Sequence, residues 1–81
     1  MNDQLNSIKE MLGEMKDDSS VPRNIRSKIN NIISEINNDN CKIDIKISRL
    51  LNYLEEISDD PNLPNYIRTE ILMGIGILSE V

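Results

Sequence analysis

Apolar residues recur along the chain at alternating steps of three and four, the spacing that places them on one face of an α-helix. Four such stripes are present, at 5–15, 25–36, 43–57 and 67–78, and polar stretches separate them. The pattern predicts an all-α fold in which four amphipathic helices are joined by short connections.

One stretch also fits a different pattern. The run CKIDIKIS at 41–48 alternates apolar and polar residues with a period of two, which is typical of a β-strand. A single strand would have no partner in an otherwise helical chain, and the stripe of Ile47 and Leu50 continues upstream to Ile43. We therefore predict a helix here, with Asp39 or Asn40 as its N-cap and Cys41 in its first turn.

Two stretches of ten residues are nearly the same. DDSSVPRNIR at 17–26 and DDPNLPNYIR at 59–68 align when the chain is shifted by 42 residues, and flanking apolar positions align with them. Matching flanks favour duplication over chance. We therefore predict one domain, 1–81, with an internal repeat of 5–36 and 47–78 and a linker at about 37–42.

Each repeated stretch is predicted to be the elbow of a helical hairpin. Ser20 and Asn62 suit the N-cap, and the prolines that follow suit the first helical turn. The arginines lie far enough into the helix to reach back to the paired aspartates. The predicted structural elbow residues are Asp17, Asp18, Pro22, Arg26, Asp59, Asp60, Pro64 and Arg68.

The residues DDSSVPRNIR and ISDDPNLPNYIRTEIL resemble a family of short archaeal proteins of uncharacterised function. That family has the pattern D-x-x-V-P-R-N-I-R, followed by S-N-D-P-N-M-P and a helix. The resemblance covers nearly the whole chain and implies an all-helical cytoplasmic protein, without an activity. This chain has NYIR where the family has a His-Ala-Arg-like run, so no role of that His is carried over.

The second elbow is also similar to the inner turn of HEAT repeats, whose period includes 42 residues. A solenoid generally needs three or more units, and this chain has two. A closed four-helix bundle, built from two duplicated antiparallel helical hairpins, is the simpler arrangement.

Charge and composition exclude several classes of function. Nine basic residues against fourteen acidic ones give a net charge of −5, which disfavours nucleic acid as a partner. The alternative of a nucleic-acid- or ribosome-associated factor would need a local basic face made of Arg23, Arg26, Lys46 and Arg49. The N-terminus is polar, and the apolar run 71–78 is shorter than the roughly 20 residues of a membrane span. We therefore expect a cytoplasmic protein with no membrane segment.

Catalytic chemistry is poorly represented. The chain has no His, no G-x-S-x-G motif and no glycine-rich phosphate loop, so we predict no catalytic residues and no cofactor. The aspartate pairs have the oxygen ligands that divalent cations prefer, but they lack calcium-loop spacing, so we predict no metal site. Cys41 has no second thiol or His beside it, and we interpret it as a structural residue.

The stretch ILMGIGILSEV at 71–81 is apolar on nearly all sides, more than one surface helix needs. Two interpretations remain: a helix buried by its neighbours, or a helix whose second face is an interface. The predicted interface residues are Leu72, Met73, Ile77 and Val81. The leading hypothesis is a non-enzymatic protein–protein interaction or oligomerising module, either a homodimer or bound to another protein.

Overall fold

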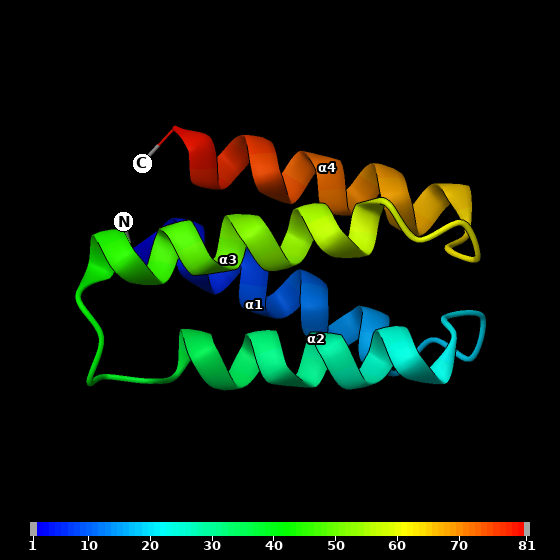
Figure 1. Ribbon diagram of the computed structural model, residues 1–81, viewed down its shortest axis with the longest axis horizontal. Helices are drawn as coiled ribbons and strands as arrows, with labels where there is room; N and C mark the ends of the chain where they lie inside the picture. The colour runs from blue at the N-terminus through cyan, green and yellow to red at the C-terminus, as the bar shows by residue number, and fades with distance from the viewer. Residues whose placement is uncertain (1, 81) are drawn as a thin grey trace.

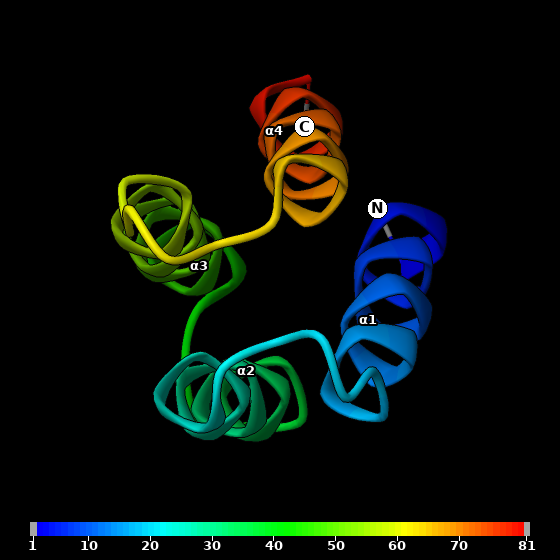
Figure 2. The same ribbon diagram turned by 90° about the vertical axis from the view of Figure 1, so that its right-hand side faces the viewer.

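Each apolar stripe forms one helix within residues 2–80, the part of the chain that the computed structural model describes. The helices are α1 (Asn2–Lys16), α2 (Arg23–Ile36), α3 (Ile43–Ser58) and α4 (Asn65–Ser79). Consecutive helices run antiparallel (Figure 1), and the end-on view places them in chain order around a square (Figure 2). The predicted all-α four-helix fold is confirmed, and the period-two stretch enters α3 as a helix.

The core lies along the axis of this square. Its buried apolar side chains come from all four helices and from two of the connections, and all of them except Met15 are Leu, Ile or Val. They are Leu5, Ile8, Leu12, Met15, Val21, Ile25, Ile29, Ile32, Ile36, Leu50, Leu54, Ile57, Leu63, Ile67, Ile71 and Leu78. Burial of so many aliphatic side chains, each worth about 1.5–3 kcal/mol, is what holds the helices together.

The connections at 17–22, 37–42 and 59–64 share one backbone turn. In each, a side-chain oxygen accepts a hydrogen bond from the backbone N–H two residues later. The pairs are Asp18 with Ser20 at 2.8 Å, Asn38 with Asn40 at 3.0 Å, and Asp60 with Asn62 at 2.9 Å. The predicted linker is thus a third copy of the elbow. Duplication of 5–36 as 47–78 stays a prediction.

The predicted helix caps are wrong. The N-cap residues are Pro22, Lys42 and Pro64, all with extended ψ angles between 144° and 149°, and none makes a side-chain capping bond. Ser20 and Asn62 lie two residues too early, because the aspartate-initiated turn engages their N–H groups before the helix starts. Asp39, Asn40 and Cys41 likewise lie in the connection before α3.

The buried face of α3 is rotated relative to that of α2 and α4. In α2 and α4 the first buried residues, Ile25 and Ile67, come three residues after the N-cap. In α3 the first buried residue is Lys46, four residues after Lys42. One residue turns a helix by about 100°. Ile43, predicted to lie in the core, is consequently 40% exposed, and Ile45 is 44% exposed.

Candidate functional site

Arg68 fastens the connection between α3 and α4. Its Nε donates to the carbonyl oxygen of Ser58 at 2.9 Å, and its Nη2 donates to that of Asp60 at 2.8 Å. Its Nη1 donates to the side chain of Asn65 at 2.9 Å. The predicted contact with the aspartate side chains is therefore wrong: the guanidinium binds backbone carbonyl groups at the end of α3 and in the turn after it, where the carbonyl oxygen of Asp60 also accepts from the N–H of Leu63 at 3.2 Å.

Arg26 occupies the corresponding position in the first elbow but is not held in the same way. Its Nε is buried and has no hydrogen-bond partner among the described residues. Asn65, which fixes one arm of Arg68, corresponds to Arg23 in this elbow, and a second guanidinium cannot accept a hydrogen bond. The two elbow arginines are therefore not equivalent.

Lys46 occupies, after the second connection, the position that Arg26 and Arg68 occupy after the other two. It lies eight residues after Asn38, the same spacing that separates Asp18 from Arg26 and Asp60 from Arg68. Its Nζ donates to the carbonyl oxygen of Ile36 at 3.0 Å, and the residue is 7% exposed. A cation at this point also interacts favourably with the negative end of the α2 dipole.

The residues of the hypothetical basic face are not gathered on one surface. Lys46 is buried, and Arg49 forms an ion pair with Glu35 at 3.0 Å. Arg23 and Arg26 lie at the other end of α2. Within residues 2–80, no group of three or more Asp, Glu, Cys or His side chains is arranged to hold a metal ion.

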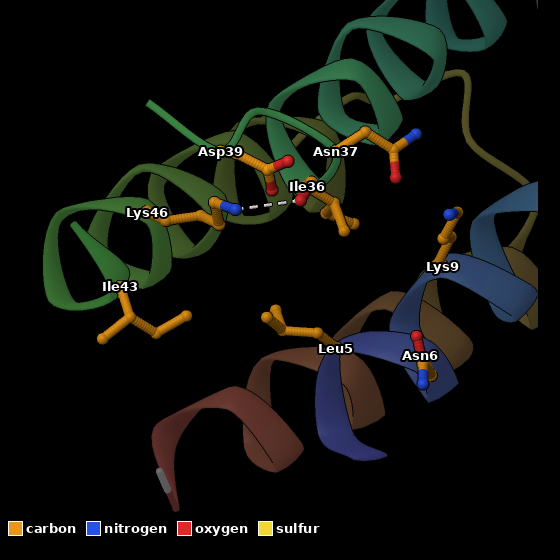
Figure 3. A pocket seen from close by; sticks show the side chains of 8 residues that line it. All are labelled: Leu5, Asn6, Lys9, Ile36, Asn37, Asp39, Ile43 and Lys46. Atoms are coloured by element: carbon orange, nitrogen blue, oxygen red, sulfur yellow. Dashed lines mark hydrogen bonds between the residues drawn. The ribbon is translucent and has the colours of Figure 1, made fainter. Parts of the chain in front are cut away.

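A cavity of about 320 Å³ opens at the end of the bundle where α1 and α3 begin and α2 ends. Figure 3 shows Lys46 and Ile36 on one wall and Leu5 and Lys9 on the opposite wall. The hydrogen bond between Lys46 and Ile36 borders the cavity, and Asp39 lies beside it. The charges there have both signs, and the lysine already serves as a helix-end cap.

The outer face of α4 carries the most exposed large apolar side chains of the described chain. Leu72 is 53% exposed and Met73 is 63% exposed, while Ile77 is half-buried. The core contribution of α4 comes instead from Ile67, Ile71, Gly74 and Leu78. Val81, the fourth residue of the predicted interface, lies outside the described residues. We call the surface made by Leu72, Met73 and Gly76 the α4 outer face.

The two glycines of α4 face different surroundings. Gly74 is buried, and a Cβ there would lie 2.9 Å from Cε of Met11 and 3.2 Å from Cδ1 of Ile8. It therefore makes room for side chains of α1. Gly76 is exposed, and a Cβ there would meet nothing within 4 Å among the described residues. Nothing in a single protomer requires a glycine at this position.

A groove runs between α1 and α4, the one pair of neighbouring helices among residues 2–80 that no connection joins. It consists of one cavity of about 250 Å³ and another of about 120 Å³, and Glu14 and Glu70 line both. Met11, Met73 and Ile77 line the larger cavity, and Asp18 and Tyr66 line the smaller one. We call these two cavities the α1–α4 groove.

Tyr66 closes the far end of the groove. Its hydroxyl donates a hydrogen bond to Oδ2 of Asp18 at 2.7 Å, across 48 residues of sequence. This bond, helped by the backbone N–H of Ser20, holds the pKa of the Asp18 carboxyl below its usual range. The same bond raises the pKa of the Tyr66 hydroxyl, because the neutral phenol is the donor.

A family model described as "Uncharacterised protein family (UPF0147)" matches residues 1–81. The chain belongs to the UPF0147 family. Its relatives come from archaea: a UPF0147 protein of Methanothermobacter thermautotrophicus is 37% identical over 98% of this chain and 80% of its own length.

A second UPF0147 protein, from Methanosarcina acetivorans, is 42% identical over 76% of this chain. The match spans 64% of that relative, slightly less than two thirds of its length. The predicted resemblance to an archaeal family of unknown function is thus confirmed.

Solved structures support the UPF0147 fold. A protein of unknown function, MMP1188, superposes with a TM-score of 0.90 at 34% identity, covering 99% of this chain and 91% of its own. A UPF0147 protein from Thermoplasma acidophilum also gives 0.90, at 26% identity, covering 98% of this chain and 93% of its own. Within residues 2–80 no helix is both long and apolar enough to cross a membrane.

Sequence reasoning missed the α1–α4 groove and the bond between Tyr66 and Asp18. Both are formed by residues from opposite ends of the sequence, so no spacing pattern within one segment indicates them. The position of Lys46 could have been predicted from the sequence, because its spacing from Asn38 repeats that of the elbow arginines from Asp18 and Asp60.

Proposed function

We propose that this protein is a non-enzymatic, cytoplasmic interaction module that forms a homodimer through the α4 outer face. The observation that carries the proposal is the exposure of Leu72 and Met73, 53% and 63%, on a helix whose core positions are already filled. The free thiol of Cys41 suits a reducing compartment.

Charge favours a second copy as the partner. Each protomer carries a net charge of −5, so two copies repel one another except where they meet through an uncharged surface. The stretch from Ile71 to Ser79 contains no charged residue. Self-association through this stretch brings no charged side chain of residues 71–79 together.

Shape favours the same partner. Leu72 and Met73 project from one turn of α4, and Gly76 on the next turn has no side chain to project. A twofold interface uses the same patch on both copies, so an axis placed between these two turns sets the side chains of one copy against the glycine of the other. This also accounts for a glycine that costs about 1 kcal/mol relative to Ala in an exposed helix.

Area sets the extent of the interface. A standard interface buries about 800 Å² on each partner. The protomer measures 32 × 21 × 19 Å, so such an interface occupies most of one side of the molecule. Half-buried Leu51 and Ile75 extend the apolar surface on the flank of the α4 outer face away from α1.

The test is the assembly state of Leu72→Glu. We expect the wild type to be a dimer by light scattering and Leu72→Glu to be a monomer with unchanged helical circular dichroism. Ile45→Glu is the matched control, since Ile45 is similarly exposed, at 44%, on α3. A wild type that stays monomeric at high concentration, or an equal effect of both substitutions, would refute the proposal.

A further inference from the structure

The α1–α4 groove combines an apolar part with an acidic part. Met11, Met73 and Ile77 form the apolar part. Glu14 and Glu70 lie where the two cavities join, and Asp18 lies farther along. No basic side chain of the described residues lines either cavity. The groove therefore has apolar contacts and negative charge in a fixed order along its length.

The groove exists because α1 and α4 make the least extensive contact of the four neighbouring helix pairs. Gly74 admits the end of Met11 instead of closing the seam with a side chain of its own. Methionine side chains are flexible and polarisable, which suits a surface that adapts to a partner. The larger cavity of the groove, about 250 Å³, leaves space beside these methionines.

We infer that the α1–α4 groove binds a basic amphipathic segment of another protein. An apolar side chain of that segment occupies the space between Met11 and Met73. A Lys or Arg farther along the segment lies between Glu14 and Glu70, whose carboxylates have no cationic partner on this chain's side of the groove. The hydrogen bond between Tyr66 and Asp18 keeps the acidic end of the groove in place.

This inference deepens the proposed function, because it names the chemical class of a partner for the same interaction module. The two contact surfaces share Met73 and differ in their other residues. The homodimer depends on Leu72 and Gly76, neither of which lines the groove. The groove depends on Glu14 and Glu70, which lie beside the α4 outer face and not within it.

The experiment uses two synthetic peptides of about four helical turns, with Leu on one face and either Lys or Glu on the other. Fluorescence anisotropy at low salt measures binding of each labelled peptide to the full chain. We expect the Lys peptide to bind and the Glu peptide not to bind. The affinity for the Lys peptide should fall as salt is added, because salt screens the charge contacts.

Two double variants locate the contact. Glu14→Gln with Glu70→Gln should weaken binding about tenfold, since each carboxylate contact at a partly exposed site contributes up to about fivefold. Glu10→Gln with Glu55→Gln removes the same net charge from exposed positions that do not line the groove. This control should change the affinity less than about twofold, because only long-range attraction is reduced.

A direct readout comes from the methionine methyl groups. With isotope-labelled methionine, the signals of Met11 and Met73 should move on addition of the Lys peptide. The inference is overturned if the Glu peptide binds equally well, if neither peptide binds, or if both double variants weaken binding equally. It is also overturned if Glu14→Gln with Glu70→Gln dissociates the dimer, since a second copy would then occupy the groove.

Failure of the homodimer proposal can be distinguished from failure of the groove proposal. If the wild type is monomeric in light scattering but the Lys peptide still binds in the predicted manner, the proposed homodimer is wrong and the groove assignment stands. If Leu72→Glu separates the protomers and leaves peptide binding intact, both proposals are supported independently.

Discussion

Replacing Arg68 by Ala should destabilise the protein much more than the same change at Arg26. Arg68 makes two partly buried hydrogen bonds to the carbonyl oxygens of Ser58 and Asp60, and an exposed third bond to Asn65. Each partly buried bond contributes about 1 kcal/mol net, and the exposed bond adds little. The free energy of unfolding should therefore fall by about 2 kcal/mol, and the melting temperature by about 10 °C.

Arg26→Ala provides the matched comparison. It removes a buried Nε that has no partner among the described residues, so its cost is limited to the packing of the side-chain stem. We expect less than about 1 kcal/mol. Arg68→Lys should lose most of the stability that Arg68→Ala loses, because an ammonium group cannot span both carbonyl oxygens as a guanidinium fork does.

Urea and thermal denaturation followed by far-UV circular dichroism measure these differences directly. Equal melting temperatures for Arg26→Ala and Arg68→Ala would show that the arginines have equivalent roles. That result would refute the reasoning from hydrogen bonds. A wild-type midpoint for Arg68→Ala would refute it as well.

Tyr66→Phe should lower the unfolding midpoint at neutral pH. A carboxyl with a depressed pKa stabilises the fold above its ordinary pKa of about 3.9, so the difference from wild type should disappear as acid protonates Asp18. The difference should also decrease as the pH rises above about 10, the ordinary pKa of a phenol, and be lost once the pH passes the raised pKa of the Tyr66 hydroxyl; thermal melts across this range test both limits. Gly13→Ala and Gly76→Ala should each stabilise the protomer by about 1 kcal/mol, since a Cβ at either position meets nothing within 4 Å among the described residues. Only Gly76→Ala should weaken the dimer in light scattering, and equal effects would contradict the role of Gly76.

The helices were predictable because each stripe is long enough to distinguish a period of 3.6 from a period of two. The caps were not, because Ser20 and Asn62 are good capping residues whose N–H groups are already bound by Asp18 and Asp60. A local competitor two residues earlier decides the outcome, and propensity alone does not include it.

The candidate site was predictable only in part. Leu72 and Met73 were identified because α4 has more apolar residues than one core face can use. The partners that turn this face into a groove, Met11 and Glu14, come from α1. Their proximity depends on how the ends of the chain meet, and a spacing rule within one helix contains no such information.

The rotation of α3 also decides which way the chain winds. In a square bundle, seen along each helix from its N-terminus, the central axis lies about 45° to one side of the line that joins this helix to the next. That side alternates from one connection to the next, because consecutive helices are antiparallel. A single backbone turn, used at all three connections, cannot supply the alternation. The apolar stripe supplies it, since the required swing of about 90° is close to the roughly 100° of one helical residue. If the stripe of α3 began at Ile45, successive hairpins would keep the same handedness and continue outward as an open superhelix.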